Sequence, residues 1–377
     1  MTTVLAERLA TLPAMDVAGR VERLRALFAE EVVDGLLVTC LTNVRYLTGF
    51  TGSAGVVVVS PDELVLVTDG RYREQAAEQM AVSGVAARLE ITGTEQRRIV
   101  TEALGGASRV GLEADHVTWA AQRRYAGEWF TAADLVPTSG LVEQLRRTKD
   151  DGELARMEAA AAVADAALAE LRPWLLTGPT EAEFALELDA TMRRLGATKP
   201  SFETIVASGP NGARPHARPS GRRVTDGDLV VLDFGAVVDG YCSDMTRTVA
   251  VGEVTEQQRN IYAIVLDAQL KGMSACRAGL TGKELDGVCR EVITANGYGE
   301  AFGHGTGHGV GRFIHEGPKV SQRGEADVLK ANMAVTIEPG IYLPGWGGVR
   351  IEDMVLVQEN GCISFSHSPK ELVILPV

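Results

Sequence analysis

The chain has 377 residues, of which 45% are hydrophobic and 23% charged, and a formal net charge of −13. This length allows two hydrophobic cores in a protein of ordinary globular composition. The acidic balance argues against nucleic acid or an anionic membrane as the main partner, because both favour a basic surface. Five dispersed cysteines without a CxxC pair indicate reduced thiols. With no apolar run of signal-peptide or membrane-span type, a cytoplasmic protein is expected.

The first part of the chain alternates helical and strand patterns. A helix is predicted over 17–31, followed by strands in GLLVTC (35–40), AGVVVVS (54–60) and LVLVTDG (64–70). Further helices are predicted over 73–82 and 94–103, and a strand in RVGLEAD at 109–115. This alternation predicts a compact α/β domain over residues 1–145.

The second part, residues 146–377, begins with the strongest helical pattern. Asp150 or Asp151 can cap that helix, and Pro173 limits its end. A second helix is predicted over 181–195, with Thr180 as the cap and Glu183 at the capping-box position. Helices over 256–275 and 282–296 and strands within 228–251 and 333–357 complete an α+β domain.

Four acids and one histidine lie on or beside apolar runs of this second domain. Burying so many carboxylates without a cation would be very costly. Their oxygen and nitrogen atoms suit two divalent ions about 3.5 Å apart. The five are Asp233 in LVVLDFG, Asp244 in YCSDMTRT, His308 in GHGTGHGVG, Glu338 in VTIEPGIY and Glu352 in VRIEDMVLV.

Asp233 and Asp244 flank a turn at residues 237–240. A loop of residues 238 and 239 places the two acids directly opposite each other, whereas a loop of 239 and 240 makes them diagonal neighbours. Either register brings their Cβ atoms to roughly 5–8 Å on one face of the sheet.

Three of the six histidines, His304, His308 and His315, fall within twelve residues of a glycine-rich segment. This clustering favours a functional site. Strand alternation places Arg350 on the same face as Glu352, where it could keep that glutamate ionised. His116 and His367 match no motif and are predicted to be structural or solvated.

The order and spacing of six segments resemble the pita-bread metallopeptidases, which include methionine aminopeptidase, prolidase and aminopeptidase P. The nearest resemblance is to bacterial cytosolic Xaa-Pro aminopeptidases and dipeptidases. In the first domain, NVRYLTGFTGS and LVTDGRY resemble the creatinase-like domain that precedes the catalytic domain of these enzymes. The six segments are FETIVASGPNGARPHARPS, LDFGAVVDGYCSDMTRT, GHGTGHGVG, IHEGP, TIEPGIYLPG and GVRIEDMVLV.

The resemblance implies a pita-bread catalytic domain with two metal ions. Manganese is the usual ion, and cobalt or zinc is possible. Asp233 would bind one ion and His308 the other, Asp244 and Glu352 would bridge them, and Glu338 would be both a ligand and a proton carrier. The implied reaction is hydrolysis of the bond between an N-terminal residue and proline by a metal-activated hydroxide. Such enzymes are commonly homodimers.

Accessory residues also follow from the resemblance. His304 and His315 would hydrogen-bond the substrate and the tetrahedral intermediate, and His216 in ARPHARP would lie near the leaving nitrogen. Arg71 in TDGRY would reach the substrate from the first domain. Arg350 is expected to support the ligands rather than to bind substrate.

Three alternative functions agree less well with the sequence. Creatinase shares the fold but lacks the metal ligands that this chain has. Methionine aminopeptidase normally lacks the first domain and a PHARP-type loop. An inactive binding scaffold of the same fold would usually have lost ligands. Whether the substrate is a dipeptide or a longer peptide with proline second is left open.

Overall fold

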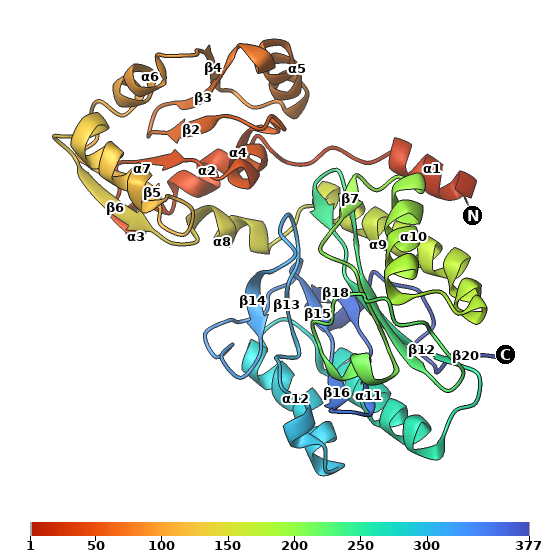
Figure 1. Ribbon diagram of the computed structural model, residues 1–377. Helices are drawn as coiled ribbons and strands as arrows, with labels where there is room; N and C mark the ends of the chain where they lie inside the picture. Colours follow the sequence, from red (N-terminus) through yellow and green to blue (C-terminus); the bar gives the residue numbers. More distant parts are fainter. Residues whose placement is uncertain (1, 377) are drawn as a thin grey trace. The chain divides into compact units, whose positions relative to one another are not determined.

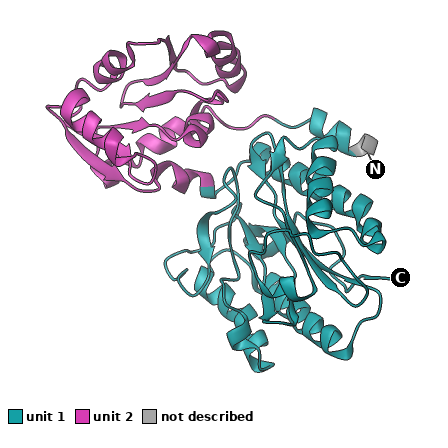
Figure 2. Ribbon diagram, viewed as in Figure 1, with its two compact units in different colours: residues 1–13, 147–377 teal, residues 14–146 magenta. Residues whose placement is uncertain are grey.

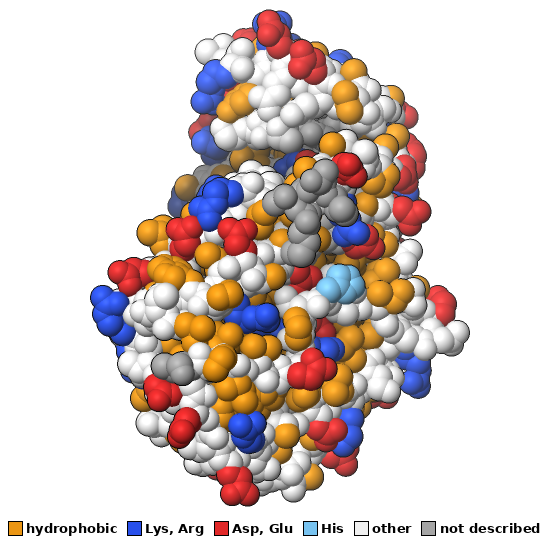
Figure 3. Space-filling view, turned by 90° about the vertical axis from the view of Figure 1, so that its right-hand side faces the viewer, with side chains coloured by type: hydrophobic (Ala, Val, Ile, Leu, Met, Phe, Trp, Pro, Cys, Tyr) orange, Lys and Arg blue, Asp and Glu red, His pale blue; other side chains and the backbone are white. Residues whose placement is uncertain are grey.

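The computed structural model describes residues 2–376, with side chains from Leu5 onward (Figure 1). The chain forms two compact units, residues 14–146 and the remainder on either side of that segment (Figure 2). Among the described residues, no helix has the length and apolar character needed to cross a membrane. Acidic and basic side chains are interspersed on the face shown in Figure 3.

The unit of residues 14–146 is a mixed six-stranded sheet with a hydrophobic core on each face. Its strands are β1 Gly35–Val38, β2 Val56–Val59, β3 Leu64–Thr68, β4 Arg88–Ile91, β5 Arg109–Glu113 and β6 Asp134–Thr138. The strand order is β4-β3-β2-β1-β5-β6. Successive side chains of a strand point to opposite faces, so Leu36 and Leu37 belong to different cores. The predicted α/β domain is confirmed.

Helices cover both faces of this sheet. They are α2 Arg20–Arg25, α3 Phe28–Glu31, α4 Leu41–Thr48, α5 Arg73–Ser83, α6 Gln96–Ala103, α7 Trp119–Arg124 and α8 Leu141–Arg147. The single helix predicted over 17–31 is therefore two short helices, α2 and α3. The second ends at Val32, which adopts the left-handed conformation.

The described part of the larger unit contains the helices α1 Thr2–Ala10, α9 Asp151–Leu171, α10 Glu181–Arg194, α11 Glu256–Ala275 and α12 Gly282–Ala295. The last four each begin with a capping box, including the predicted pair Thr180 and Glu183. A cap of this kind stabilises a helix by about 1 kcal/mol. Shorter helical turns lie at η1 Gly70–Tyr72, η2 Tyr125–Trp129, η3 Arg172–Thr177, η4 Gly209–Ala213 and η5 Gly299–Ala301.

Two helix pairs of this unit pack on separate sheets. Helices α9 and α10 share a core with β8, β9 and β12, and α11 and α12 share a core with β15 and β18. The sheets have the orders β20-β12-β9-β8, β11-β10-β7, β14-β13-β15-β18-β19 and β16-β17. Their strands are β7 Lys199–Pro200, β8 Ile205–Ser208, β9 Leu229–Phe234, β10 Ala236–Val238, β11 Tyr241–Cys242, β12 Met245–Val251, β13 Gly307–Gly309, β14 Glu316–Val320, β15 Ala334–Ile337, β16 Gly340–Leu343, β17 Gly347–Arg350, β18 Asp353–Gln358, β19 Gly361–Ser364 and β20 Ile374–Leu375.

Helix α1 belongs to the larger unit, although the expected division at residue 145 grouped it with the first domain. Leu5 is buried against the alanine-rich face of α9, where Ala159, Ala160 and Val163 belong to the same core. The small side chains of α9 let α1 approach closely. Residues 14–146 are therefore inserted between two segments of one unit.

The turn between β10 and β11 fixes the register of the first two acids. Val238 pairs with Tyr241, so the loop consists of Asp239 and Gly240. Both loop residues have positive φ, 45° and 82°, as a two-residue hairpin of this kind requires. The structure thus selects the second of the two predicted registers, in which Asp233 and Asp244 are diagonal neighbours.

Candidate metal centre and active site

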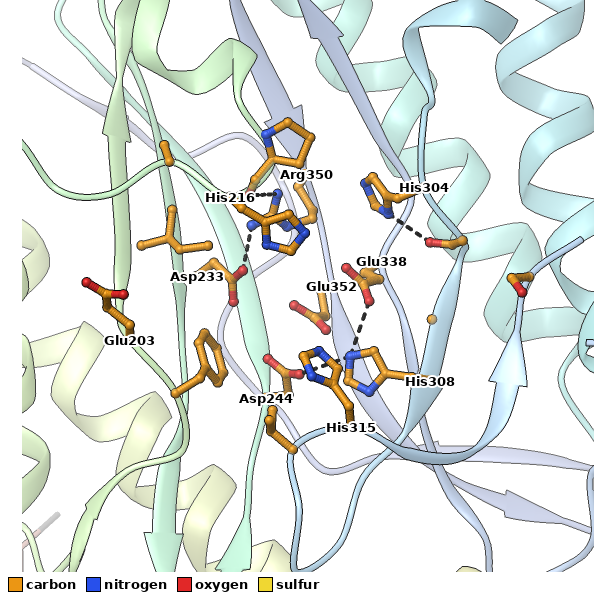
Figure 4. A pocket seen from close by; sticks show the side chains of 18 of the residues that line it. Glu203, His216, Asp233, Asp244, His304, His308, His315, Glu338, Arg350 and Glu352 are labelled. Carbon is orange, nitrogen blue, oxygen red and sulfur yellow. Dashed lines mark hydrogen bonds and ion pairs between the residues drawn. The ribbon is translucent and has the colours of Figure 1, made fainter. Parts of the chain in front are cut away.

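One cavity of about 490 Å³ in the larger unit gathers nine of the ten residues singled out from the sequence (Figure 4). They come from strands and loops spread between residues 216 and 352. The nine are His216, Asp233, Asp244, His304, His308, His315, Glu338, Arg350 and Glu352. The tenth, Arg71, lies in the unit of residues 14–146, on the turn η1.

Three carboxylates form the centre of the cavity. Asp233 comes from β9, Asp244 from the link between β11 and β12, and Glu352 from the link between β17 and β18. Each offers an oxygen, and these oxygens lie within 4.8 Å of one another. Burial, together with the neighbouring acids, raises the pKa of Asp244 and of Glu352 well above the ordinary range. A bound cation would reverse this penalty.

The donor set fits divalent ions on an independent structural ground. The Oδ1 atom of Asp233 is buried and has no hydrogen-bond partner among the described residues. Buried polar atoms are seldom left unsatisfied in folded proteins. Asp233 therefore presents a free acceptor beside Asp244 and Glu352, as a hard cation requires.

His308 and Glu338 extend this acidic centre. The Nε2 atom of His308 lies 3.6 Å from Asp244 Oδ2 and 3.5 Å from Glu338 Oε1. Its Nδ1 lies 3.1 Å from the carbonyl oxygen of Gly309, which assigns the proton to Nδ1 and leaves the lone pair of Nε2 facing the acids. Burial lowers the pKa of His308 to about 4, so the imidazole is neutral at neutral pH. Burial raises the pKa of Glu338 to about 8.

The glycines around His308 allow its strand to fit between two others. An added Cβ at Gly307 would lie 2.0 Å from the carbonyl oxygen of Thr336, and one at Gly309 would lie 2.1 Å from that of Gly317. Any side chain at these positions would push β13 away from its neighbours. The glycines on either side of His308 thus allow β13 to lie close enough to its neighbours for His308 to reach the acids.

Arg350 contacts Asp233 rather than Glu352, the partner expected from strand alternation. Its Nη2 donates to Asp233 Oδ2 at 2.5 Å, and its Nε donates to Thr246 Oγ1 at 3.0 Å. Thr246 in turn donates to Glu352 Oε2 at 2.6 Å. Strand β17 ends at Arg350, so the alternation that would pair positions 350 and 352 does not continue to Glu352.

The accessory histidines border the acidic centre. His304 Nε2 lies 2.8 Å from Tyr342 Oη, and burial lowers the pKa of His304 to about 4. The rings of His308 and His315 meet edge to face with centroids 4.4 Å apart. His216 is an exposed loop residue that reaches the cavity. Figure 4 shows these rings beside the carboxylates.

Arg71, His116 and His367 do not line this cavity. Arg71 forms a two-point contact with Asp69 and is 67% exposed. His116 contacts Glu143, and His367 lies outside the cavity, bound to Asp165 through its backbone.

Sequence reasoning missed several residues of the site. Tyr342 links His304 to Arg350 Nη1, which donates to Tyr342 Oη at 2.9 Å. Thr246 links Arg350 to Glu352. Tyr342 and Thr246 could have been found from the sequence, because they lie in the same segments as Glu338 and Asp244. Lys319, Arg218 and Glu203 also line the cavity. Glu203 and Arg218 lie in the segment FETIVASGPNGARPHARPS and Lys319 directly follows IHEGP, but none of the three was given a role from the sequence.

Comparison with known proteins agrees with this geometry. Residues 155–359 match metallopeptidase family M24, and residues 20–148 match the creatinase/prolidase N-terminal domain. The peptidase YqhT of Bacillus subtilis is 45% identical over 94% of this chain and 100% of its own length. The Xaa-Pro dipeptidase of Pyrococcus furiosus is 37% identical, over 94% and 99% respectively.

Solved structures give the same result. A Xaa-Pro dipeptidase from Bacillus anthracis superposes with a TM-score of 0.91 at 44% identity, covering 95% of this chain and 100% of that one. An X-Pro aminopeptidase from Thermotoga maritima gives 0.86 at 35%, covering 93% and 99%. The predicted resemblance and fold are confirmed, and the family implies divalent metal ions at the site. The chain belongs to metallopeptidase family M24 and carries the N-terminal domain of creatinases and prolidases.

Proposed function

We propose that this protein is a metallo-exopeptidase that hydrolyses the bond between an N-terminal residue and a following proline. The observation that carries the proposal is the convergence of four carboxylates and His308 in one cavity bordered by three further histidines. Three of the relatives described above, from Pyrococcus furiosus, Bacillus anthracis and Thermotoga maritima, are by name Xaa-Pro dipeptidases or aminopeptidases. Methionine aminopeptidase is not favoured, because this chain carries the creatinase/prolidase N-terminal domain. An inactive scaffold is not favoured either, because the full donor set is present.

Two divalent ions fit the donor set. Asp233 would hold one ion and His308 the other, with Asp244 and Glu352 shared between them and Glu338 as a further ligand. Four of the five donors supply oxygen, which favours manganese, with cobalt or zinc as alternatives. When bound, the ions acidify a water molecule and polarise the scissile carbonyl.

Glu338 is the proton carrier of the proposed reaction. It takes a proton from the attacking water and delivers it to the proline nitrogen as the peptide bond breaks. In the chain without metal, burial raises the pKa of this carboxyl group to about 8. His315 is a neutral hydrogen-bond donor to the substrate carbonyl and to the tetrahedral intermediate. His304 would share this role by exchanging its present contacts, because its Nδ1 lies 2.8 Å from the carbonyl oxygen of Gly305 and its Nε2 lies 2.8 Å from Tyr342 Oη. His216 lies near the leaving nitrogen.

A dipeptide substrate carries a free carboxylate directly after proline, and the cavity offers cations for it. Lys319 lines the cavity, and its ammonium makes no ion pair within the described residues. Arg218 also lines it and lies 3.5 Å from Glu203 in an exposed pair. We assign carboxylate recognition to Lys319, with Arg218 nearby, and therefore favour Xaa-Pro dipeptides as substrates.

Three finer assignments belong to the same proposal. Arg71 contacts the substrate from the first unit, which its 67% exposed side chain would permit. A homodimer rests on the family resemblance alone. A cytoplasmic location rests on the five free thiols.

The test is a manganese-supplemented cleavage assay that compares a Xaa-Pro dipeptide, its C-terminal amide and a Xaa-Pro-Xaa tripeptide. Turnover of the dipeptide with little turnover of the amide supports dipeptide recognition through the carboxylate. Efficient release of the first residue from the tripeptide would show that the protein is an Xaa-Pro aminopeptidase and not a dipeptidase. A metal-loaded protein that cleaves none of these but cleaves Met-Ala peptides refutes the proline-specific reading.

A further inference from the structure

Glu181, the first residue of α10, is a buried carboxylate outside the cavity that the proposed reaction does not use. Its side chain is fully buried. Oε1 accepts hydrogen bonds from Ser208 N and Oγ, both at 2.7 Å, and Oε2 accepts from Ser220 N at 3.0 Å and Ser220 Oγ at 2.6 Å. The amide of Asn211 donates to both oxygens. Among the described residues no lysine or arginine forms an ion pair with it, so these neutral donors replace its hydration.

These donors come from the two ends of one loop. Residues 209–220, here called the His216 loop, begin directly after Ser208 at the end of β8 and end at Ser220. Glu181 therefore connects the two ends of the loop through hydrogen bonds to Ser208 and Ser220. The backbone of the same helix start adds to this, since Glu181 N donates to Arg222 O and Ala182 N donates to Ser220 O, both at 3.0 Å.

His216 at the apex of this loop has no side-chain hydrogen bond to any described residue. The contacts beside it hold the loop itself: Arg350 Nη1 donates to the carbonyl oxygen of Pro215 at 3.2 Å, and the side chain of Ala217 is buried with Ile205, Ala207 and Val231. Lower in the loop, Gly212 lies so close to β17 that an added Cβ would be 3.0 Å from Gly348 N. The place of the His216 ring is thus set by the backbone of the loop.

We propose that Glu181 is a positioning residue for the reaction, which holds the His216 loop closed at its base and so keeps His216 in the cavity. This inference rests on the proposed function for the role of His216, but the hold on the loop stands apart from it. Burial alone would raise the pKa of Glu181, but the bonds from Ser220, Ser208 and Asn211 outweigh it and lower that pKa. The carboxylate is therefore ionised when the enzyme works.

A glutamine cannot replace this carboxylate. Each oxygen accepts a backbone N–H, one from Ser208 and one from Ser220, so the amide group of glutamine would place its N–H₂ against one of those N–H donors. One end of the loop must then be released. Glu181→Gln keeps the size of the side chain, removes its negative charge and replaces one acceptor oxygen by an N–H₂ donor.

The experiment compares Glu181→Gln with Glu183→Gln, two residues along the same helix. Glu183 accepts only from Thr180 and is exposed, so its variant makes the same chemical change and weakens the same helix start. Amide hydrogen exchange across 205–222 and steady-state kinetics on a Xaa-Pro dipeptide are measured in manganese-loaded protein. His216→Ala and the Glu181→Gln/His216→Ala double variant complete a double-mutant cycle, which shows whether Glu181 acts through His216. Asn211→Ala serves as a milder second variant if Glu181→Gln does not fold.

We expect Glu181→Gln to exchange faster in 209–220 and to lose about 10–100-fold in kcat with a KM within a few-fold of wild type. Metal content stays unchanged, and the double variant is no worse than His216→Ala alone. Glu183→Gln shows neither effect. Unchanged exchange in Glu181→Gln, or losses that add to those of His216→Ala, overturn the proposal. Hydrogen exchange needs no turnover, so it tests the hold on the loop even if the proposed peptidase activity fails.

Discussion

Arg350 binds Asp233 at 2.5 Å and leaves the other oxygen of that carboxylate without a partner inside the cavity. The same guanidinium reaches Thr246 and Tyr342, so it connects the acidic centre to His304. Arginine can hold such a set because its planar group carries five donors in fixed directions.

Arg350→Lys should reduce metal affinity or kcat/KM by about 10–100-fold, because lysine cannot keep these contacts together. Isothermal titration with manganese and dipeptide kinetics would measure both. Arg146→Lys is the matched control: Arg146 is also buried and pairs with an acid, Glu143, in the unit of residues 14–146. It should lower the melting temperature but not the metal affinity. Equal loss of affinity in both variants would refute the role of Arg350.

Asp244→Asn and Glu352→Gln should each abolish stoichiometric metal binding and lower kcat by about 10³-fold or more, since the loss is several kcal/mol of transition-state stabilisation. Elemental analysis and kinetics would measure this. Asp267→Asn, on the exposed face of α11, is the control and should change neither. Retention of two ions per chain by Asp244→Asn would exclude that residue as a shared ligand.

The stability of the metal-free protein should fall as the pH rises from about 6.5 to about 8. Glu338 holds its proton up to about pH 8 in the folded chain but only to about 4.5 when unfolded. The folded state therefore binds more protons in this range, and the free energy of unfolding decreases with pH. His304 and His308 act in the opposite direction, but only below about pH 6.5.

Melting temperatures in a chelating buffer and with added manganese would measure this effect. The decrease should be absent with manganese and smaller in metal-free Glu338→Gln. A metal-free wild type whose melting temperature is flat or rises between these pH values would contradict the expected protonation of Glu338.

Lys319→Met should raise KM for a Xaa-Pro dipeptide by about 10–100-fold, the value of one charge-assisted hydrogen bond. The effect on the corresponding dipeptide amide should be small, because the amide offers no carboxylate. Lys283→Met is the control, since Lys283 pairs with Glu325 outside the cavity. Equal losses on dipeptide and amide would remove Lys319 from carboxylate recognition.

Arg71→Met should leave metal content unchanged and raise KM, by about 10-fold for a lost charge-assisted contact. Arg88→Met is the control, because Arg88 is a partly exposed arginine of the same unit that pairs with Glu63. Kinetics identical to those of wild type would show that Arg71 does not reach the substrate.

The sequence predicted the elements that carry strong local signals. Helices α9 and α10 begin at their predicted caps, and the five candidate ligands share one cavity with three histidines. The prediction that assumed strand alternation to continue past the end of a strand was wrong. Arg350 and Glu352 are separated by the end of β17, so their contact could not be read from alternation.

Other features left no local signal. Helix α4 begins at Cys40, which provides no side-chain cap, and it was not predicted. Tyr342 and Glu181 owe their importance to partners far away in the sequence, and single-sequence patterns do not contain those pairings. Likewise, the attachment of α1 to α9 depends on complementary shape rather than on periodicity.

That attachment has a consequence for biosynthesis. Leu5 leaves the ribosome before any part of α9 exists, and roughly 150 residues must be made before the two helices can meet, on the order of 10 s at usual elongation rates. During that interval residues 14–146 are completed, with their own two cores, while the apolar side of α1 lacks its final partner. Folding of the catalytic unit therefore includes a long-range closure between two segments separated by one that has already folded.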